Sequence, residues 1–182
     1  MNFAVIDLEF TQPNRKIIQI GAVTLDLQKG EIKDLFDEVC NPGEEPNSFI
    51  SDLTGISSKA VREAPSLKDS LVEFWRVFKE AKISGRLASW GAVDIDLIRE
   101  ASLELGLTIP YVDRYNFKNM TRFFRSASGQ SAKKGVGLKN VSQDLELAFE
   151  GQQHNALADA RQAAKIMLSY YDQFREGVSP IG

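Results

Sequence analysis

The first forty residues contain three strand-like segments joined by short turns, and this arrangement is the strongest constraint on the fold. The segments span residues 3–10, 16–27 and 31–40, and turn-prone Gln-Pro-Asn and Gln-Lys-Gly sequences separate them. Because such short connections join neighbouring strands of opposite direction, we predict an antiparallel three-stranded meander. Beyond residue 43 the apolar spacing becomes helical.

The rest of the chain alternates between helical and strand-like segments. A stripe of apolar side chains predicts one core-facing helix: Leu67, Leu71, Phe74, Trp75 and Phe78. Residues 86–90 and 109–113 indicate strands, and further helices are expected at residues 97–105, 117–124, 138–145 and 155–174. We therefore predict a single α/β domain over residues 1–182, with a mixed five-stranded sheet, its first strand central, and helices on both faces.

Composition excludes several classes of protein. Residues 1–10 hold too few consecutive apolar side chains for a signal peptide or a membrane span, so a cytoplasmic protein without membrane contact is expected. Cys40 is the only cysteine, which rules out an internal disulfide and a thiolate-rich zinc site.

Charge is distributed unevenly along the chain, although the net charge is only -3. No acidic residue occurs between Arg114 and Gln143, while the remainder carries 25 acidic residues. Seven basic residues fall in this segment: Arg114, Lys118, Arg122, Arg125, Lys133, Lys134 and Lys139. An acidic body with one basic segment is expected of a metal-dependent enzyme that attracts a polyanion.

Three of these basic residues recur along one side of the helix expected at residues 117–124. Lys118, Arg122 and Arg125 lie opposite its apolar side and should be exposed. Lys133 and Lys134 fall in a Ser/Gly-rich stretch at residues 126–137, which we expect to be a mobile loop. An ordinary solvated helix face and a solubilising loop are the competing interpretation.

Two carboxylates interrupt the first strand. Asp7 and Glu9 are two residues apart, so their side chains point to the same face of the sheet. The apolar residues before them suggest burial, and two buried carboxylates repel each other unless a cation binds them. Oxygen ligands alone favour Mg²⁺ or Mn²⁺ over zinc. The alternative is a solvated polar face of an edge strand.

Three further residues are candidates for the same site. Asp94 follows the strand that ends at Trp90, at the sheet edge where functional residues gather, but it could be a helix N-cap, and Asp96 is equally compatible by spacing. His154 is the only histidine, and a lone histidine is more often a surface or structural residue. Asp159 would lie about 140° from it around a helix. We therefore expect His154 in the loop before that helix, leaning over the site that Asp159 lines.

In this order, Asp7-Leu8-Glu9, Asp94 and the run from His154 to Asp159 resemble the DEDDh exonucleases, the DnaQ-like group with a ribonuclease-H-like fold. The resemblance spans nearly the whole chain. It implies a 3'-to-5' exonuclease that releases nucleoside 5'-monophosphates from single-stranded RNA or DNA. It also implies two Mg²⁺ ions, for which Mn²⁺ can substitute.

The resemblance also assigns roles. Asp7 would bridge both ions, Glu9 and Asp159 would complete the sphere of one, and Asp94, now favoured over Asp96, would act through water at the other. His154 would be the general base, and a neutral imidazole suits that task. The residues expected to contact the substrate are Phe10, Thr11, Leu53, Trp90, Arg122, Arg125, Lys133 and Lys134.

Two departures from the family pattern concern the substrate rather than the metal ligands. Val93 occupies a position that is often aromatic, and Phe10 replaces a smaller residue. Two alternatives also stay open: a nucleic-acid or protein binding module of the same fold without activity, and a scavenger of very short oligonucleotides.

Overall fold

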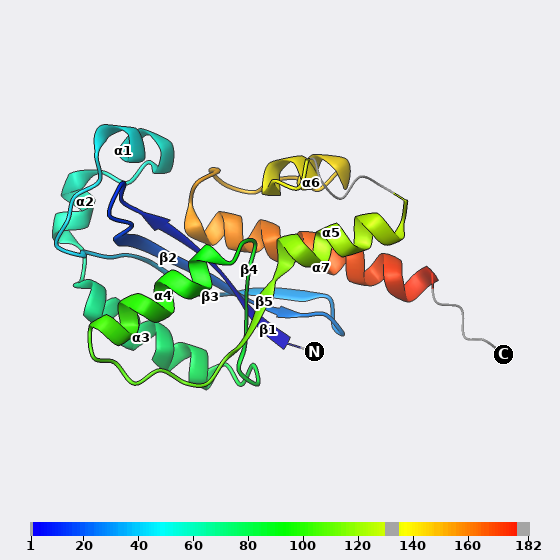
Figure 1. Cartoon of the computed structure of the whole chain (residues 1–182), viewed down its shortest axis with the longest axis horizontal. Coiled ribbons are helices and arrows are strands. Elements are labelled where there is room, and N and C mark those ends of the chain that lie inside the picture. The colour runs from blue at the N-terminus through cyan, green and yellow to red at the C-terminus, as the bar shows by residue number, and fades with distance from the viewer. Residues whose placement is uncertain (1, 130–134, 178–182) are drawn as a thin grey trace.

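The computed structural model describes residues 2–129 and 135–177 (Figure 1). The elements in chain order are β1 (Asn2–Phe10), β2 (Ile17–Asp26), β3 (Glu31–Val39), α1 (Ser48–Thr54), α2 (Ser58–Glu63), α3 (Leu67–Glu80), β4 (Arg86–Ser89), α4 (Val93–Glu104), β5 (Asp113–Asn116), α5 (Phe117–Ala127), α6 (Leu138–Asp144) and α7 (Ala156–Gly177). None of the helices in these ranges is long and apolar enough to cross a membrane.

The strands form one mixed sheet in the order β3-β2-β1-β4-β5. The first three strands pair antiparallel, and β1, β4 and β5 run parallel. The predicted meander, the five-stranded mixed sheet and the central position of β1 are all confirmed. Because β1 and β4 are parallel neighbours, their carboxyl ends meet at the same edge of the sheet.

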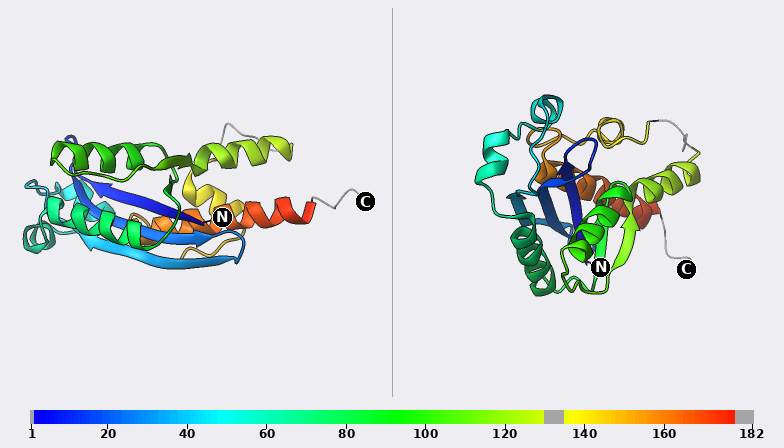
Figure 2. Two further views of the ribbon diagram at one scale, coloured as in Figure 1. Left: turned by 90° about the horizontal axis from the view of Figure 1, so that it is seen from below. Right: turned by 60° about the vertical axis from the view of Figure 1, so that its left-hand side comes forward.

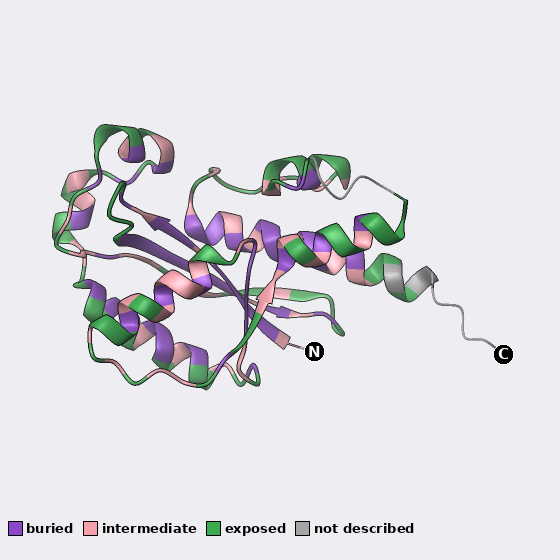
Figure 3. Ribbon diagram, viewed as in Figure 1, coloured by how far each residue is buried: buried purple, intermediate pink, exposed green. Residues whose placement is uncertain are grey.

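Helices cover both faces of the sheet (Figure 2). Ala4, Ile6 and Leu8 share a core with side chains of α3 and α4, whereas Phe3 and Val5 share a core with α5, α6 and α7. Both layers keep β1 and β2 buried along most of their length (Figure 3). Successive strand residues alternate between faces, so Asp7 and Glu9 fall on the face covered by α7.

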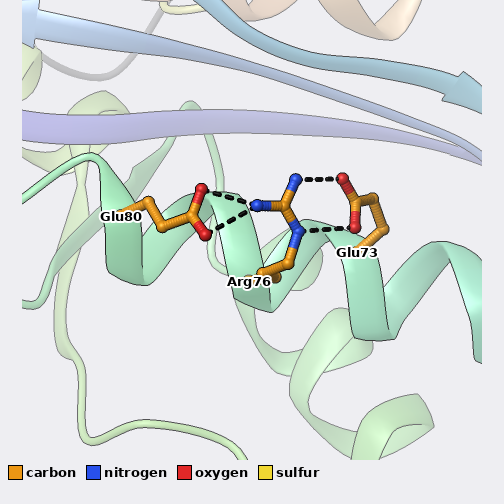
Figure 4. A network of polar contacts seen from close by, with 3 residues as sticks. All are labelled: Glu73, Arg76 and Glu80. Carbon is orange, nitrogen blue, oxygen red and sulfur yellow. Dashed lines mark hydrogen bonds and ion pairs between the residues drawn. The ribbon is translucent and has the colours of Figure 1, made fainter.

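The amphipathic pattern predicted for α3 is confirmed. Its apolar stripe is buried, and its outer face carries an ion-pair network in which Arg76 lies between two glutamates (Figure 4). Arg76 donates to Glu73 at 2.8 Å through Nε and to Glu80 at 2.6 Å. All three side chains are about half exposed, so this network orders the solvent face of α3 and adds little to stability.

The strand predicted at residues 109–113 is wrong. Pairing with β4 begins only at Asp113, which lies opposite Arg86, and continues to Asn116. Ile109 and Val112 instead pack against the core under α3 and α4 from an irregular segment, and Pro110 has no N–H to donate to a neighbouring strand. Their apolar character therefore reflects burial rather than strand pairing.

Candidate active site

The carboxyl edge of β1 and β4 brings together acids from two elements. Asp7 and Glu9 come from β1, and Asp94 lies in the first turn of α4, which starts four residues after β4 ends. The Asp94 carboxylate accepts a hydrogen bond from the backbone of Leu8, which ties α4 to β1 beside the other acids.

The structure also separates Asp94 from its competing interpretations. Asp96 forms an ion pair with Arg114 at 2.8 Å. Its charge is not among the causes that shift the pKa values of Asp7, Glu9 and Asp159. The N-cap position of α4 is Ala92, without a side-chain cap. Asp94 is therefore neither the cap of α4 nor interchangeable with Asp96.

The start of α7 supplies the remaining two residues. His154 lies two residues before the helix, in the loop position expected, and its backbone is left-handed with a φ of 59°. Its N–H donates to Asp159 Oδ2 at 3.2 Å. One ligand atom each from Glu9, His154 and Asp159 lie within 4.8 Å of one another. Glu9 thus meets two residues that lie 145 and 150 positions further along the chain.

Two residues of β2 let α7 approach the sheet this closely, and the sequence patterns did not reveal them. Gly21 lies opposite Asp7, and a Cβ there would meet the Leu157 nitrogen at 2.1 Å. Gln19 lies opposite Glu9 and accepts a hydrogen bond from the Ala156 N–H at 3.1 Å. A largely apolar strand gave no signal that a helix end would contact these positions.

The electrostatics of the acids depend on burial and on one another. Burial raises the pKa of Asp7 well above its usual value, and the carboxylates of Asp94, Asp159 and Glu9 raise it further. The pKa of Glu9 is raised to about 8, mainly by burial and then by Asp159 and Asp94.

The same causes act on the other two acids, with partial relief. Burial raises the pKa of Asp94 to about 6, although its backbone hydrogen bonds oppose the shift. Burial also raises the pKa of Asp159, against the hydrogen bond and charge of His154. Four carboxylates that destabilise one another's charged forms are the arrangement that a divalent cation would relieve, and their oxygen atoms suit Mg²⁺ or Mn²⁺. The donor set therefore fits the expected metal.

A cleft of about 340 Å³ opens beside these acids. Two of the predicted substrate contacts, Phe10 and Leu53, line it. Phe49 of α1 also lines it and is 67% exposed. Phe49 was not singled out from the sequence, because one aromatic residue in a short helix gives no periodic signal.

Two predicted substrate contacts lie elsewhere. Thr11 is buried, and its Oγ1 accepts a hydrogen bond from the backbone of Lys16 within the β1–β2 turn. Trp90 is 8% exposed and packs in the core on the α7 side. Neither side chain lines the cleft, since each is turned into the body of the fold.

The basic residues divide into different groups. Arg122 is exposed on α5 and Lys118 is partly exposed, as predicted. The prediction that Arg125 is exposed is wrong: its side chain is 7% exposed, forms an ion pair with Asp144 and donates to Tyr170 Oη. It sits at the buried junction of α5, α6 and α7, a partnership that helical spacing does not disclose. Lys133 and Lys134 lie outside the described residues.

A sheet of this order, with four acids and one histidine at its carboxyl edge, defines a nuclease of the DEDDh class with a ribonuclease-H-like fold. The exonuclease family RNase_T matches residues 4–167, and the chain belongs to this family. Its relatives include other DnaQ-like 3'-to-5' exonucleases, and metal dependence is a property of the group.

Two curated relatives illustrate the similarity. The PolC-type DNA polymerase III of Caldanaerobacter subterraneus subsp. tengcongensis is 28% identical over 177 residues, which are 96% of this chain and 12% of that protein. The ERI1 exoribonuclease 2 of Xenopus laevis is 26% identical over 186 residues, covering 89% of this chain and 27% of that protein. The chain thus spans a small part of these relatives' length.

Solved structures agree on the fold. The nuclease domain of 3'hExo, a DEDDh family member bound to rAMP, superposes with a TM-score of 0.76 at 21% identity, covering 97% of this chain and 92% of that one. The Mg²⁺- and Mn²⁺-bound form of S. pombe Pop2p superposes with a TM-score of 0.69 at 16% identity, covering 97% of this chain and 85% of that one.

Proposed function

We propose that residues 1–182 form one exonuclease domain that hydrolyses the terminal phosphodiester bond at the 3' end of single-stranded RNA or DNA and releases nucleoside 5'-monophosphates. The observation that carries this proposal is the convergence of carboxylates from β1, α4 and α7 with His154 beside an open cleft. The rAMP bound to the nuclease domain of 3'hExo belongs to the proposed class of products and supports the proposal.

In this proposal Asp7, Glu9, Asp94 and Asp159 hold two Mg²⁺ ions, for which Mn²⁺ can substitute. Bound divalent cations supply electrostatic stabilisation to the attacking and leaving oxygens of a phosphodiester. His154 takes the proton of the attacking water, because its side chain is exposed at the rim of the acid cluster, where water reaches it. The backbone hydrogen bond from His154 to Asp159 keeps these two residues together.

The cleft residues would hold the terminal nucleoside. Phe49 presents an exposed ring on which a base can stack, and Phe10 and Leu53 form apolar walls. Thr11 and Trp90 are buried and do not line this cleft, so they are left out of the proposed contacts.

The backbone of a longer strand would follow α5. Lys118 donates its backbone N–H to Trp90 O at 2.9 Å, so this helix starts beside the end of β4. Lys118, which is partly exposed, and Arg122, which is exposed, would supply the positive charge for phosphate contacts along this helix. Lys133 and Lys134, which lie outside the described residues, stay predicted contacts, whereas Arg125 is buried against Asp144 and Tyr170.

The test is digestion of matched single-stranded RNA and DNA, labelled at the 5' end, with Mg²⁺ or with a chelator. The proposal expects a ladder of products shortened from the 3' end, release of mononucleotides and full dependence on the metal. A set of substrate lengths distinguishes a general exonuclease from a scavenger of very short oligonucleotides. Binding of the strands without metal-dependent product would overturn the proposal in favour of a binding module.

A further inference from the structure

Gln19 makes two hydrogen bonds of opposite polarity from a buried position in β2. Gln19 is only 3% exposed. The amide nitrogen donates to Asp37 Oδ1 of β3 at 2.9 Å, and the amide oxygen accepts from the N–H of Ala156 at 3.1 Å. Ala156 is the first residue of α7. We propose that Gln19 is a positioning residue that fixes the first turn of α7 against the acids of β1.

The location of Ala156 makes this contact specific to the site. It lies two residues after His154 and three before Asp159, in the turn that contributes both to the acid cluster. The other hydrogen bonds of this turn are internal: His154 N–H donates to Asp159 Oδ2, Ala158 N–H donates to the Asn155 side chain, and Asp159 N–H donates to Asn155 O. They keep the turn in shape but do not place it on the sheet. Gln19 does so, from the position directly opposite Glu9.

Gly21 supplies the complementary requirement, which is space. A Cβ at this residue would meet backbone atoms of Ala156 and Leu157 at 2.1 to 2.5 Å, closer than atoms can approach. The first turn of α7 therefore rests on the bare backbone opposite Asp7, while Gln19 fixes it laterally. The pair sets the separation between the acids of β1 and those of α7. The expected effect of these contacts on hydrolysis rests on the proposed function.

The polarity of the two bonds explains why glutamine suits position 19. The Ala156 N–H needs an acceptor, since the first N–H groups of a helix have no partner within it. The Asp37 carboxylate accepts from the amide nitrogen, and this bond orients the Gln19 amide so that its oxygen faces Ala156. Glutamine offers one of each, methionine of similar size offers neither, and glutamate would oppose one carboxylate with another. Combining Gln19→Glu with Asp37→Asn restores a donor and an acceptor with their places exchanged.

The experiment compares Gln19→Met, Gln19→Glu, Asp37→Asn and the double variant Gln19→Glu/Asp37→Asn with the unaltered chain. Three quantities are measured: exchange of the Ala156 amide hydrogen without metal, the dissociation constant of Mn²⁺ by calorimetry, and kcat and KM on a labelled oligonucleotide. For Gln19→Met we expect faster Ala156 exchange and a loss of about 10-fold to 100-fold in metal affinity or kcat, the usual effect of removing a residue that orients a ligand. KM should stay within about twofold, since Gln19 does not line the cleft.

Gln162→Met is the matched control. Gln162 lies on α7, is as buried as Gln19, and donates a hydrogen bond of 2.9 Å to Ser142 Oγ of α6 rather than to a strand of the sheet. It should lower the melting temperature without changing kcat or Mn²⁺ affinity. The double variant should recover most of the defect of Gln19→Glu. The inference is overturned if Gln19→Met behaves like Gln162→Met, or if the double variant recovers nothing.

The measurements also separate this inference from the proposed function. If the unaltered chain hydrolyses no nucleic acid, the proposed function fails, while amide exchange and Mn²⁺ affinity still decide the role of Gln19. If hydrolysis is normal and insensitive to position 19, only the positioning role fails. Should Gln19→Met not fold, Gln19→Glu with and without Asp37→Asn answers the same question.

Discussion

At the scale of single residues, Asp7 is the most constrained side chain of the site. It lies opposite the glycine on which α7 rests and is surrounded by three other acids, which together with burial raise its pKa. Replacing it by Asn removes a charge that the metal-free protein destabilises, so Asp7→Asn should raise the metal-free melting temperature near pH 8 while abolishing hydrolysis. Asp172→Asn, at an exposed site on α7, should change neither quantity. A less stable Asp7→Asn protein would contradict this account of the cluster.

His154 carries the proposed proton transfer. His154→Ala should lower kcat by a factor of about 10² to 10⁴, the usual contribution of a general base, with Mn²⁺ affinity reduced far less than by Asp159→Asn. Steady-state kinetics and calorimetry on the two variants make the comparison. An unchanged rate would return His154 to a structural role in the loop before α7.

At the scale of elements, α5 combines two arginines with different tasks. Arg122 is exposed, so Arg122→Gln should leave the melting temperature unchanged but weaken the salt dependence of binding to a long single strand. Each lost phosphate contact reduces the slope of log affinity against log salt by about 0.7. Filter binding over a range of salt concentrations, with the catalytically inactive Asp7→Asn protein, measures it. Identical slopes with and without Arg122 would mean that α5 does not touch the strand.

Arg125 should behave in the opposite way. Arg125→Met removes hydrogen bonds to Tyr170 and Asp144 at the junction of α5, α6 and α7, and should lower the free energy of unfolding by about 1–3 kcal/mol. The salt slope of strand binding should not change. Chemical denaturation and the same binding measurement test the two halves of the expectation.

The elements also show what sequence patterns can and cannot predict. The meander and α3 were predictable because strand-like segments bounded by short turns and helical periodicity extend over nine or more residues in each. β5 has only four residues, and the apolar residues just before it are buried without strand pairing, so the pattern indicated the wrong segment. Asp7 and Glu9 were singled out because their charges interrupt an apolar strand, whereas Asp94 was favoured over Asp96 only through the family resemblance. Gln19 and Gly21 were not singled out, since their roles depend on contact with residues more than 130 positions away.

At the scale of the whole molecule, proton binding and metal binding should be linked to stability. The pKa of Glu9 is raised from 4.5 to about 8 and that of Asp94 from 3.8 to about 6. Between the usual and the raised pKa of each group, the native metal-free protein holds more protons than the unfolded chain. The free energy of unfolding of the metal-free protein should therefore fall as pH rises toward 8. Mg²⁺ binds the deprotonated acids, and its stabilising effect should therefore increase over the same range.

Thermal melts at several pH values between about 5 and 9, with Mg²⁺ or a chelator, would measure this linkage. Glu9→Gln should flatten the pH dependence seen with the chelator, because it removes a carboxyl group whose pKa is raised to about 8. A stabilising effect of Mg²⁺ that does not vary with pH would argue against metal binding by these acids.

The left-handed backbone of His154 gives the site an evolutionary signature. Its φ of 59° disfavours a side chain with a Cβ by about 1 kcal/mol, a strain that glycine would not carry. Random substitution under selection for folding alone would therefore replace this histidine by glycine or asparagine. A lineage that keeps histidine here does so against the preference of its own backbone. Under the proposed function, its retention would mark descendants in which hydrolysis is under selection, and its loss would mark those in which the fold serves another purpose.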